Sequence, residues 1–221
     1  MTGTHERHRT APAPRPRQHG SLWRELPVLI VIAVLVAVTI RVFVLQTFWI
    51  PSGSMEHTLD INDRVLVNKI SLDFRSPHRG EVIVFRSPVS WRTDPAEKDF
   101  IKRVIALGGD HITCCDRAGR ISVNGHALDE TSYLYRGADG EQEPPSDGRF
   151  DVRVPDGRIW VMGDHRLESG DSREHYLQTR DPNEATIPAS SVIGDAFAIY
   201  WPPSRMRFLG VPRTFDRVPD P

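Results

Sequence analysis

The chain has 221 residues, 26% of them charged and 39% hydrophobic, and a formal net charge of −1 at pH 7. This length provides for one domain of ordinary size together with shorter appended segments. Proteins that bind nucleic acid carry a large excess of positive charge, so the near-neutral balance argues against a nucleic-acid partner.

The first 21 residues form a basic segment with almost no apolar side chains. The stretch THERHRTAPAPRPRQHG (4–20) mixes arginine and histidine with proline and threonine. Such a composition cannot bury enough apolar surface to fold. We therefore expect residues 1–21 to be a disordered basic tail.

A long apolar run follows the tail. The stretch LPVLIVIAVLVAVTI (26–40) carries no charge, and the apolar character continues past Arg41 to Ile50. A membrane span needs about 20 apolar residues, and Arg41 and Trp49 suit the membrane interface. We predict a transmembrane anchor over residues 22–45. Because arginines precede the run, we expect a single-pass protein of the plasma membrane, with its N-terminus in the cytoplasm.

Two other interpretations of the apolar run are less favoured. A cleaved signal peptide ends in small residues, whereas this run ends in VLQTFWIPS (44–52). A buried core helix is usually apolar on one face, whereas this run is apolar on every side.

Residues 46–204 are predicted to form an extracytoplasmic, β-rich domain, followed by a C-terminal tail over 205–221. Asn124-Gly125 and Asp156-Gly157 suit tight hairpin turns. Two polar segments rich in turn residues, 87–98 and 131–149, are expected to be exposed loops. Seven short segments rich in β-branched and aromatic residues are typical of strands: 64–70, 80–86, 100–107, 120–128, 150–154, 158–164 and 192–201. The expected fold is mainly β, with antiparallel sheets.

Two residues of this domain are candidates for nucleophilic catalysis. Ser54, in the turn PSGSM (51–55), can act as a nucleophile if a base removes its proton, although such stretches commonly form simple turns. Only three of the 28 lysine and arginine residues are lysines. Lys102 lies in a strand-like segment beside Phe100, Val104 and Ala106, and a desolvated lysine can serve as a base, which arginine cannot. The alternation of side chains along a strand does not show whether Lys102 or its neighbour Arg103 points into the protein. It is also compatible with a lysine whose amine lies in solvent.

The stretch MGDHRLESGDSR (162–173) places several carboxylates, arginines and a serine in one loop. The ligand spacing of an EF-hand is absent, so a calcium site is not expected. Pairing between arginine and carboxylate side chains would stiffen the loop, which could then hold Ser169 as a supporting hydrogen-bond partner.

Five stretches together resemble the conserved boxes of type I signal peptidases, the membrane-anchored serine endopeptidases that remove signal peptides. The stretches are PSGSMEHTL, RVLVNKI, RGEVIVFRSP, DFIKRVIALGGD and GDHRLESGDSR. They occur in the same order as in the family and follow a predicted anchor with the expected orientation, and the resemblance covers about residues 25–202. The resemblance implies a mostly β catalytic domain with an apolar surface near the bilayer. It also implies exported preproteins and the lipid bilayer as partners, and no cofactor.

The resemblance implies a role for individual residues. Ser54 matches the nucleophile and Lys102 its general base, while the Ser52 hydroxyl and the Ser54 N–H match the oxyanion hole. Ser169 matches the serine that orients the lysine amine. Asp171 and Arg173 match a pair that supports the site from behind.

The chain departs from the family pattern at three positions. His57 and Gly109 stand where the family usually has proline, and His165 stands where it usually has asparagine. A Ser–His mechanism is therefore chemically conceivable. We still favour Lys102 as the base, because the two histidines occupy positions where the family keeps non-catalytic residues.

Cys114 and Cys115 are adjacent in the sequence, which is compatible with either a disulfide or two free thiols. A disulfide between neighbours is uncommon, whereas two free thiols outside the cell would be exposed to oxidation. Two adjacent cysteines without further ligands predict no metal site.

Three functions other than a general signal peptidase are compatible with parts of the sequence. One is a processing peptidase dedicated to a few substrates, which the sequence does not distinguish from a general enzyme. Another is a self-cleaving repressor protease, which would have a DNA-binding domain where this chain has its apolar run. The last is a non-enzymatic anchored β domain, in which Ser54 would only form a turn.

Overall fold

The computed structural model describes residues 22–39 and 45–221. The predicted basic tail (1–21) and residues 40–44 of the predicted anchor lie outside the described residues. The chain divides into two compact units, Met1–Thr39 and Ile40–Pro221.

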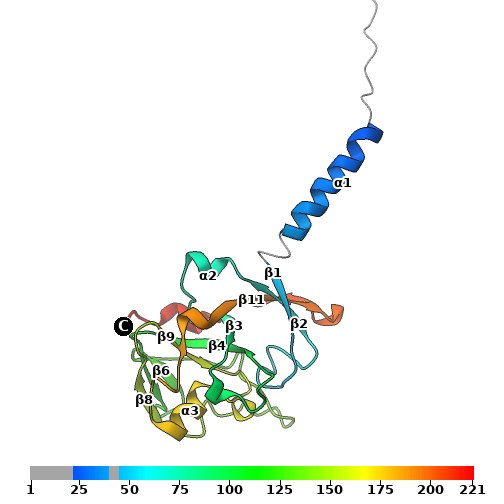
Figure 1. Ribbon diagram of the computed structural model, residues 1–221. Helices are drawn as coiled ribbons and strands as arrows, with labels where there is room; N and C mark the ends of the chain where they lie inside the picture. The colour runs from blue at the N-terminus through cyan, green and yellow to red at the C-terminus, as the bar shows by residue number, and fades with distance from the viewer. Residues whose placement is uncertain (1–21, 40–44) are drawn as a thin grey trace, which may run out of the picture. The chain divides into compact units, whose positions relative to one another are not determined.

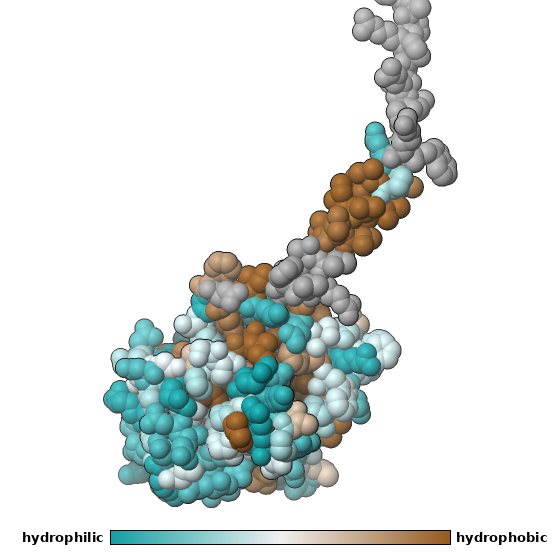
Figure 2. All heavy atoms as spheres, viewed as in Figure 1, coloured by the Kyte–Doolittle hydropathy of each residue, from teal (hydrophilic) through white to brown (hydrophobic). Residues whose placement is uncertain are grey.

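The described part of the first unit is one helix, α1 (Leu22–Thr39). Its side chains over residues 25–36 are exposed, and Figure 2 shows most of them as hydrophobic. The helix covers the larger part of the predicted anchor, whose last residue, Leu45, is the first residue of a strand. None of the helices in the described ranges meets both the length and the hydropathy expected of a membrane span.

The second unit confirms the predicted mainly β fold with antiparallel sheets (Figure 1). Its larger sheet has the order β1-β2-β11-β3-β4-β9-β10, with β12 paired to β11. The bounds are β1 (Leu45–Trp49), β2 (Arg64–Asn68), β3 (Val82–Arg86), β4 (Asp99–Leu107), β9 (Arg158–Met162), β10 (Ile187–Pro188), β11 (Val192–Trp201) and β12 (Arg207–Phe208).

The smaller sheet has the order β7-β6-β5-β8. Its strands are β5 (His111–Cys114), β6 (Ile121–Val123), β7 (His126–Ala127) and β8 (Phe150–Arg153). Asn124 and Gly125 have positive φ angles and form the hairpin between β6 and β7, as predicted. Asp156-Gly157 does not form a hairpin, because β8 and β9 belong to different sheets and the turn carries the chain from one to the other.

Helices in the second unit are short. Over residues 45–221 they are α2 (Ser71–Phe74), α3 (Ser172–Thr179) and short 3₁₀ segments at Val89–Trp91, Arg166–Glu168, Ala189–Ser191, Pro203–Arg205 and Arg213–Arg217. The side chain of Asp171 caps α3 by accepting hydrogen bonds from the backbone N–H groups of Arg173 and Glu174. Arg180 ends the helix in the left-handed region, with φ of 58°.

Two segments pack more closely than the sequence suggested. The loop 131–149, expected to be exposed, places Tyr133 and Leu134 in the hydrophobic core. The segment 205–221, expected as a tail, contributes Phe215 and Val218 to the same core. Both segments are polar on average, but a few apolar side chains are enough to dock them.

The larger sheet is buried on both faces in the region of β4. Val104 belongs to one hydrophobic cluster and Ile105 to another, as alternation along a strand requires. A β-bulge between Val104 and Ala106 then shifts the register, so Ala106 joins the cluster of Ile105. The expected grouping of Ala106 with Phe100 and Val104 is therefore wrong.

Candidate active site

Ser54 lies in the loop that joins β1 to β2. The loop is closed at its base by a backbone hydrogen bond of 2.9 Å from Ile50 N to Asp63 O. Inside the loop, Met55 and Leu59 are fully buried, and Leu59 N donates to Met55 O at 2.7 Å. The residue after the serine is thus a core residue, which fixes the position of the serine itself.

The hydroxyl of Ser54 contacts the amine of Lys102, which lies on β4. The distance between Lys102 Nζ and Ser54 Oγ is 2.6 Å, and the two residues are only 5% and 6% exposed. Lys102 Nζ also lies 5.7 Å from the centre of the Phe100 ring. The structure thus brings together the two residues expected to form the catalytic pair.

The environment of Lys102 changes its acidity. Burial lowers the pKa of Lys102 from 10.5 to about 8, because the loss of solvent disfavours the ammonium more than the carboxylates of Asp171, Glu97 and Asp164 favour it. A substantial fraction of the amine is therefore neutral in mildly basic solution. Only the neutral amine can accept a proton from a serine hydroxyl.

Ser54 and Lys102 both line a pocket of about 210 Å³. It is lined by residues from the serine loop, from the segment between β3 and β4, from β4 and from the loop before α3, among them Ser52, Trp91 and Phe100. Within the described residues, neither the Ser52 hydroxyl nor the Ser54 N–H donates a hydrogen bond to the protein. Both donors predicted for the oxyanion hole are thus available to a ligand.

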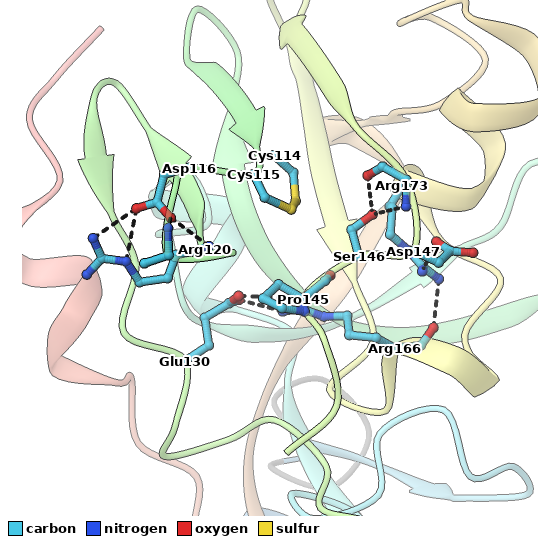
Figure 3. Close-up of a disulfide and its surroundings, with 12 residues drawn as sticks. Cys114, Cys115, Asp116, Arg120, Glu130, Pro145, Ser146, Asp147, Arg166 and Arg173 are labelled. Carbon is cyan, nitrogen blue, oxygen red and sulfur yellow. Dashed lines mark hydrogen bonds and ion pairs between the residues drawn. A yellow bond between two sulfur atoms is a disulfide. The ribbon is translucent and has the colours of Figure 1, made fainter. Parts of the chain in front are cut away.

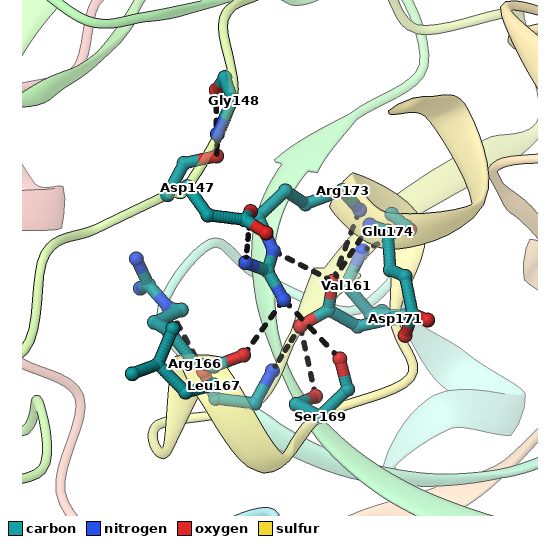
Figure 4. A network of polar contacts seen from close by, with 12 residues as sticks. Asp147, Gly148, Val161, Arg166, Leu167, Ser169, Asp171, Arg173 and Glu174 are labelled. Carbon is teal, nitrogen blue, oxygen red and sulfur yellow. Dashed lines mark hydrogen bonds and ion pairs between the residues drawn. The ribbon is translucent and has the colours of Figure 1, made fainter. Parts of the chain in front are cut away.

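The three predicted supporting residues form one network at the start of α3 (Figure 4). Ser169 Oγ donates to Asp171 Oδ2 at 2.8 Å, and Arg173 Nη2 donates to the carbonyl oxygens of Arg166 at 2.7 Å and Ser169 at 3.3 Å. Among the described residues, the hydrogen-bond partner of the Lys102 amine is Ser54, not Ser169. The network links the loop before α3 to the start of that helix.

Gly163 is a site residue that the sequence analysis did not identify. Its N–H donates to Asp171 Oδ2 at 3.0 Å. A Cβ atom at this position would lie 2.3 Å from Ser169 Oγ and 2.4 Å from Ser54 O. Only glycine therefore allows the loop to pass so close to the backbone of the serine.

A buried ion pair, also missed, lies behind the site. Arg103 Nε and Nη2 donate to Asp164 Oδ1 and Oδ2 at 2.8 and 2.6 Å, and Thr58 donates to the same carboxylate. The Arg103 guanidinium also lies 4.5 Å from the centre of the Tyr133 ring. Lys102 and Arg103 therefore point to opposite faces of β4, where the lysine meets the serine and the arginine ties β4 to the loop before α3.

The three residues that differ from the family pattern lie in different environments. His57 is exposed with φ of 80°, and Gly109 has φ of 91°, which proline cannot adopt. His165 is 9% exposed and contacts Gly53 O and Glu56 through Nδ1. The described hydrogen bond of the Ser54 hydroxyl is with Lys102 and not with a histidine, which favours the lysine as base.

Cys114 and Cys115 form a disulfide at the end of β5 (Figure 3). The same view shows Arg166, whose Nη2 pairs with Glu130 Oε1 at 2.5 Å in the protein interior. Among the described residues, no group of three or more His, Cys, Asp or Glu side chains is suited to hold a metal ion.

Comparison with known proteins gives a consistent result. The family model described as "Signal peptidase, peptidase S26" matches residues 23–201. The signal peptidase I of Mycobacterium tuberculosis is 41% identical over 228 residues, covering 87% of this chain and 76% of the relative. The probable signal peptidase I of Mycobacterium leprae is 38% identical, covering 88% of this chain and 81% of the relative. A solved signal peptidase I from Enterococcus faecalis V583 covers 55% of this chain and 97% of its own, with 24% identity and a TM-score of 0.39.

Proposed function

The chain belongs to the signal peptidase family, peptidase S26, and we propose that Ser54 is its nucleophile and Lys102 its general base. As a member of this family it is a serine endopeptidase that removes signal peptides from preproteins. The observation that carries the assignment of the two residues is the buried contact of 2.6 Å between Lys102 Nζ and Ser54 Oγ.

In the proposed mechanism, neutral Lys102 takes the proton from Ser54 Oγ as this oxygen attacks the scissile carbonyl. The C–N bond then breaks, the lysine ammonium returns its proton to the leaving amine, and the signal peptide remains as an acyl ester on Ser54. Water, activated by the same amine, hydrolyses the ester. The lowered pKa of Lys102 supports this role, because the amine can be neutral near physiological pH.

The negative charge on the attacked carbonyl oxygen needs donors. The Ser54 N–H and the Ser52 hydroxyl would supply them, since neither is engaged within the described protein and both residues line the pocket. Loss of one such donor costs about 2.7–4 kcal/mol of transition-state stabilisation in other serine hydrolases. Ser169, Asp171 and Arg173 would support the site by fixing the loop before α3.

We further propose that the substrate lies in extended form beside β4, with residues next to the scissile bond in the pocket that contains Ser54 and Lys102. The enzyme would be held at the plasma membrane by the anchor over residues 22–45, with the basic tail in the cytoplasm and the peptidase domain outside. The apolar, exposed surface of α1 supports an anchor, and the Cys114–Cys115 disulfide supports an oxidising compartment.

The test is cleavage of a preprotein by the detergent-solubilised wild type, Ser54→Ala and Lys102→Ala, with Lys98→Ala as a matched control at an exposed lysine. We expect the first two variants to be inactive and the control to be fully active. The wild-type rate should rise as the pH increases through about 8, because the neutral amine is the active form. Retained cleavage by Lys102→Ala would show that another group is the base.

A further inference from the structure

His165 makes contacts with both peptide groups that flank the proposed nucleophile. Its ring Nδ1 lies 3.2 Å from Gly53 O, and its backbone N–H donates to Ser54 O at 3.2 Å. Gly53 O belongs to the peptide group that also contains the Ser54 N–H. One residue of the loop before α3 therefore contacts the peptide groups on either side of Ser54.

The contact with Gly53 O has a consequence for the Ser54 N–H. A peptide group is planar and trans, so its C=O and N–H point in opposite directions. Any contact that fixes the direction of the Gly53 carbonyl also fixes the direction of the Ser54 N–H. This N–H is the backbone donor of the proposed oxyanion hole, and its direction decides how well it can stabilise the oxyanion.

The His165 ring is itself held on several sides. Nδ1 also lies 3.1 Å from Glu56 Oε2, and Nε2 lies 3.1 Å from Glu143 Oε1. Tyr135 stacks on the ring with 3.9 Å between the ring centres and an interplanar angle of 17°. Both atoms that contact Nδ1 are acceptors, Gly53 O and Glu56 Oε2, so we place a proton on Nδ1, which the two acceptors share.

We propose that His165 is a positioning residue that orients the Ser54 N–H toward the oxyanion by donating from Nδ1 to Gly53 O. This inference rests on the proposed function, because it assigns a role through Ser54. Glu56, Glu143 and Tyr135 hold the ring in place, and His165 takes no proton from Ser54.

The geometry distinguishes two amide substitutions that are otherwise similar. Nδ2 of asparagine, like Nδ1 of histidine, is bonded to Cγ, whereas Nε2 of glutamine corresponds to histidine Nε2. His165→Asn therefore keeps a donor for Gly53 O and loses the contact with Glu143. His165→Gln moves its donor toward Glu143, and His165→Phe keeps a ring for Tyr135 but has no donor.

The experiment measures kcat and KM for preprotein cleavage by the full-length wild type and the three His165 variants in detergent. Ser54→Ala defines the background, and thermal unfolding reports folding. His111→Phe is the matched control, because His111 pairs with Asp151 on the protein surface, away from the serine loop. We expect His165→Asn to keep most of the wild-type kcat. His165→Gln and His165→Phe should lose kcat by about 100-fold at little-changed KM, as expected for a misplaced catalytic group.

Three results would overturn the proposal: full kcat in His165→Phe, equal losses in His165→Asn and His165→Gln, or a change in KM alone. If His165→Phe does not fold, the difference in kcat between His165→Asn and His165→Gln still tests the proposal. Cleavage by Ser54→Ala would instead refute the proposed function, so the two failures are distinguishable.

Discussion

The substitution Lys102→Met should abolish cleavage and yet stabilise the protein at pH 7. Methionine fills nearly the same volume as the lysine stem but carries no amine. At pH 7 the buried amine of the wild type is mostly protonated, because its pKa is about 8. Removing a charged group from a site with so little solvent should therefore favour the folded state.

The magnitude follows from the shift in pKa. A decrease from 10.5 to about 8 means that protonated Lys102 destabilises the folded state by roughly 3 kcal/mol below pH 8. The unfolded chain binds more protons than the folded one between these values, so this penalty declines as the pH rises from 8 to above 10.5. The substitution also loses the hydrogen bond with Ser54, which costs about 1 kcal/mol. The expected net gain is about 2 kcal/mol at pH 7 and about zero at pH 10.

The assay is urea unfolding of the detergent-solubilised protein at both pH values, followed by tryptophan fluorescence. Lys98→Met, at an exposed lysine, is the matched control and should change the free energy of unfolding at neither pH. A Lys102→Met variant that is less stable than the wild type at pH 7, or a gain that is the same at pH 7 and pH 10, would refute the reasoning.

Two further substitutions test the surroundings of the site. Gly163→Ala should reduce cleavage strongly, because its Cβ would lie 2.4 Å from Ser54 O and displace the serine loop; kinetic measurement of kcat checks this, and unchanged kcat contradicts it. Arg103→Met should lower the free energy of unfolding by about 3–5 kcal/mol, since it leaves the Asp164 carboxylate buried without its partner. The double variant Arg103→Met/Asp164→Leu should recover much of that loss in urea unfolding, and a double variant as unstable as Arg103→Met would contradict this explanation.

The sequence predicted most of the strands, but not that β4 is buried on both of its faces. The segments assigned as strands recur in β2, β3, β4, β6 with β7, β8, β9 and β11. Alternation could not choose between Lys102 and Arg103, because β4 is buried on both faces and both side chains are buried. The resemblance to signal peptidases, and not the pattern of residues, selected the lysine that contacts Ser54.

Other features were missed for identifiable reasons. The strand β1 (LQTFW) continues the apolar run of the predicted anchor, so composition gives no boundary between them. The helix α3 is polar, but Asp171 followed three residues later by Glu174 has the spacing of a capping box and could have indicated its start. Nothing in the sequence pairs Arg103 with Asp164 or His165 with Gly53, because these contacts join segments far apart in the chain.

The order of strands in the larger sheet also bears on when activity can arise during synthesis. Ser54 precedes β2 and Lys102 lies on β4, but β11 (Val192–Trp201), which is synthesised about 90 residues after Lys102, lies between β2 and β3. A nascent chain that has not yet released residues 192–201 lacks the strand that joins the serine loop to the strands carrying the lysine. We therefore expect a partly synthesised chain to be inactive, and proteolytic activity to begin only after residues 192–201 have left the ribosome and formed β11.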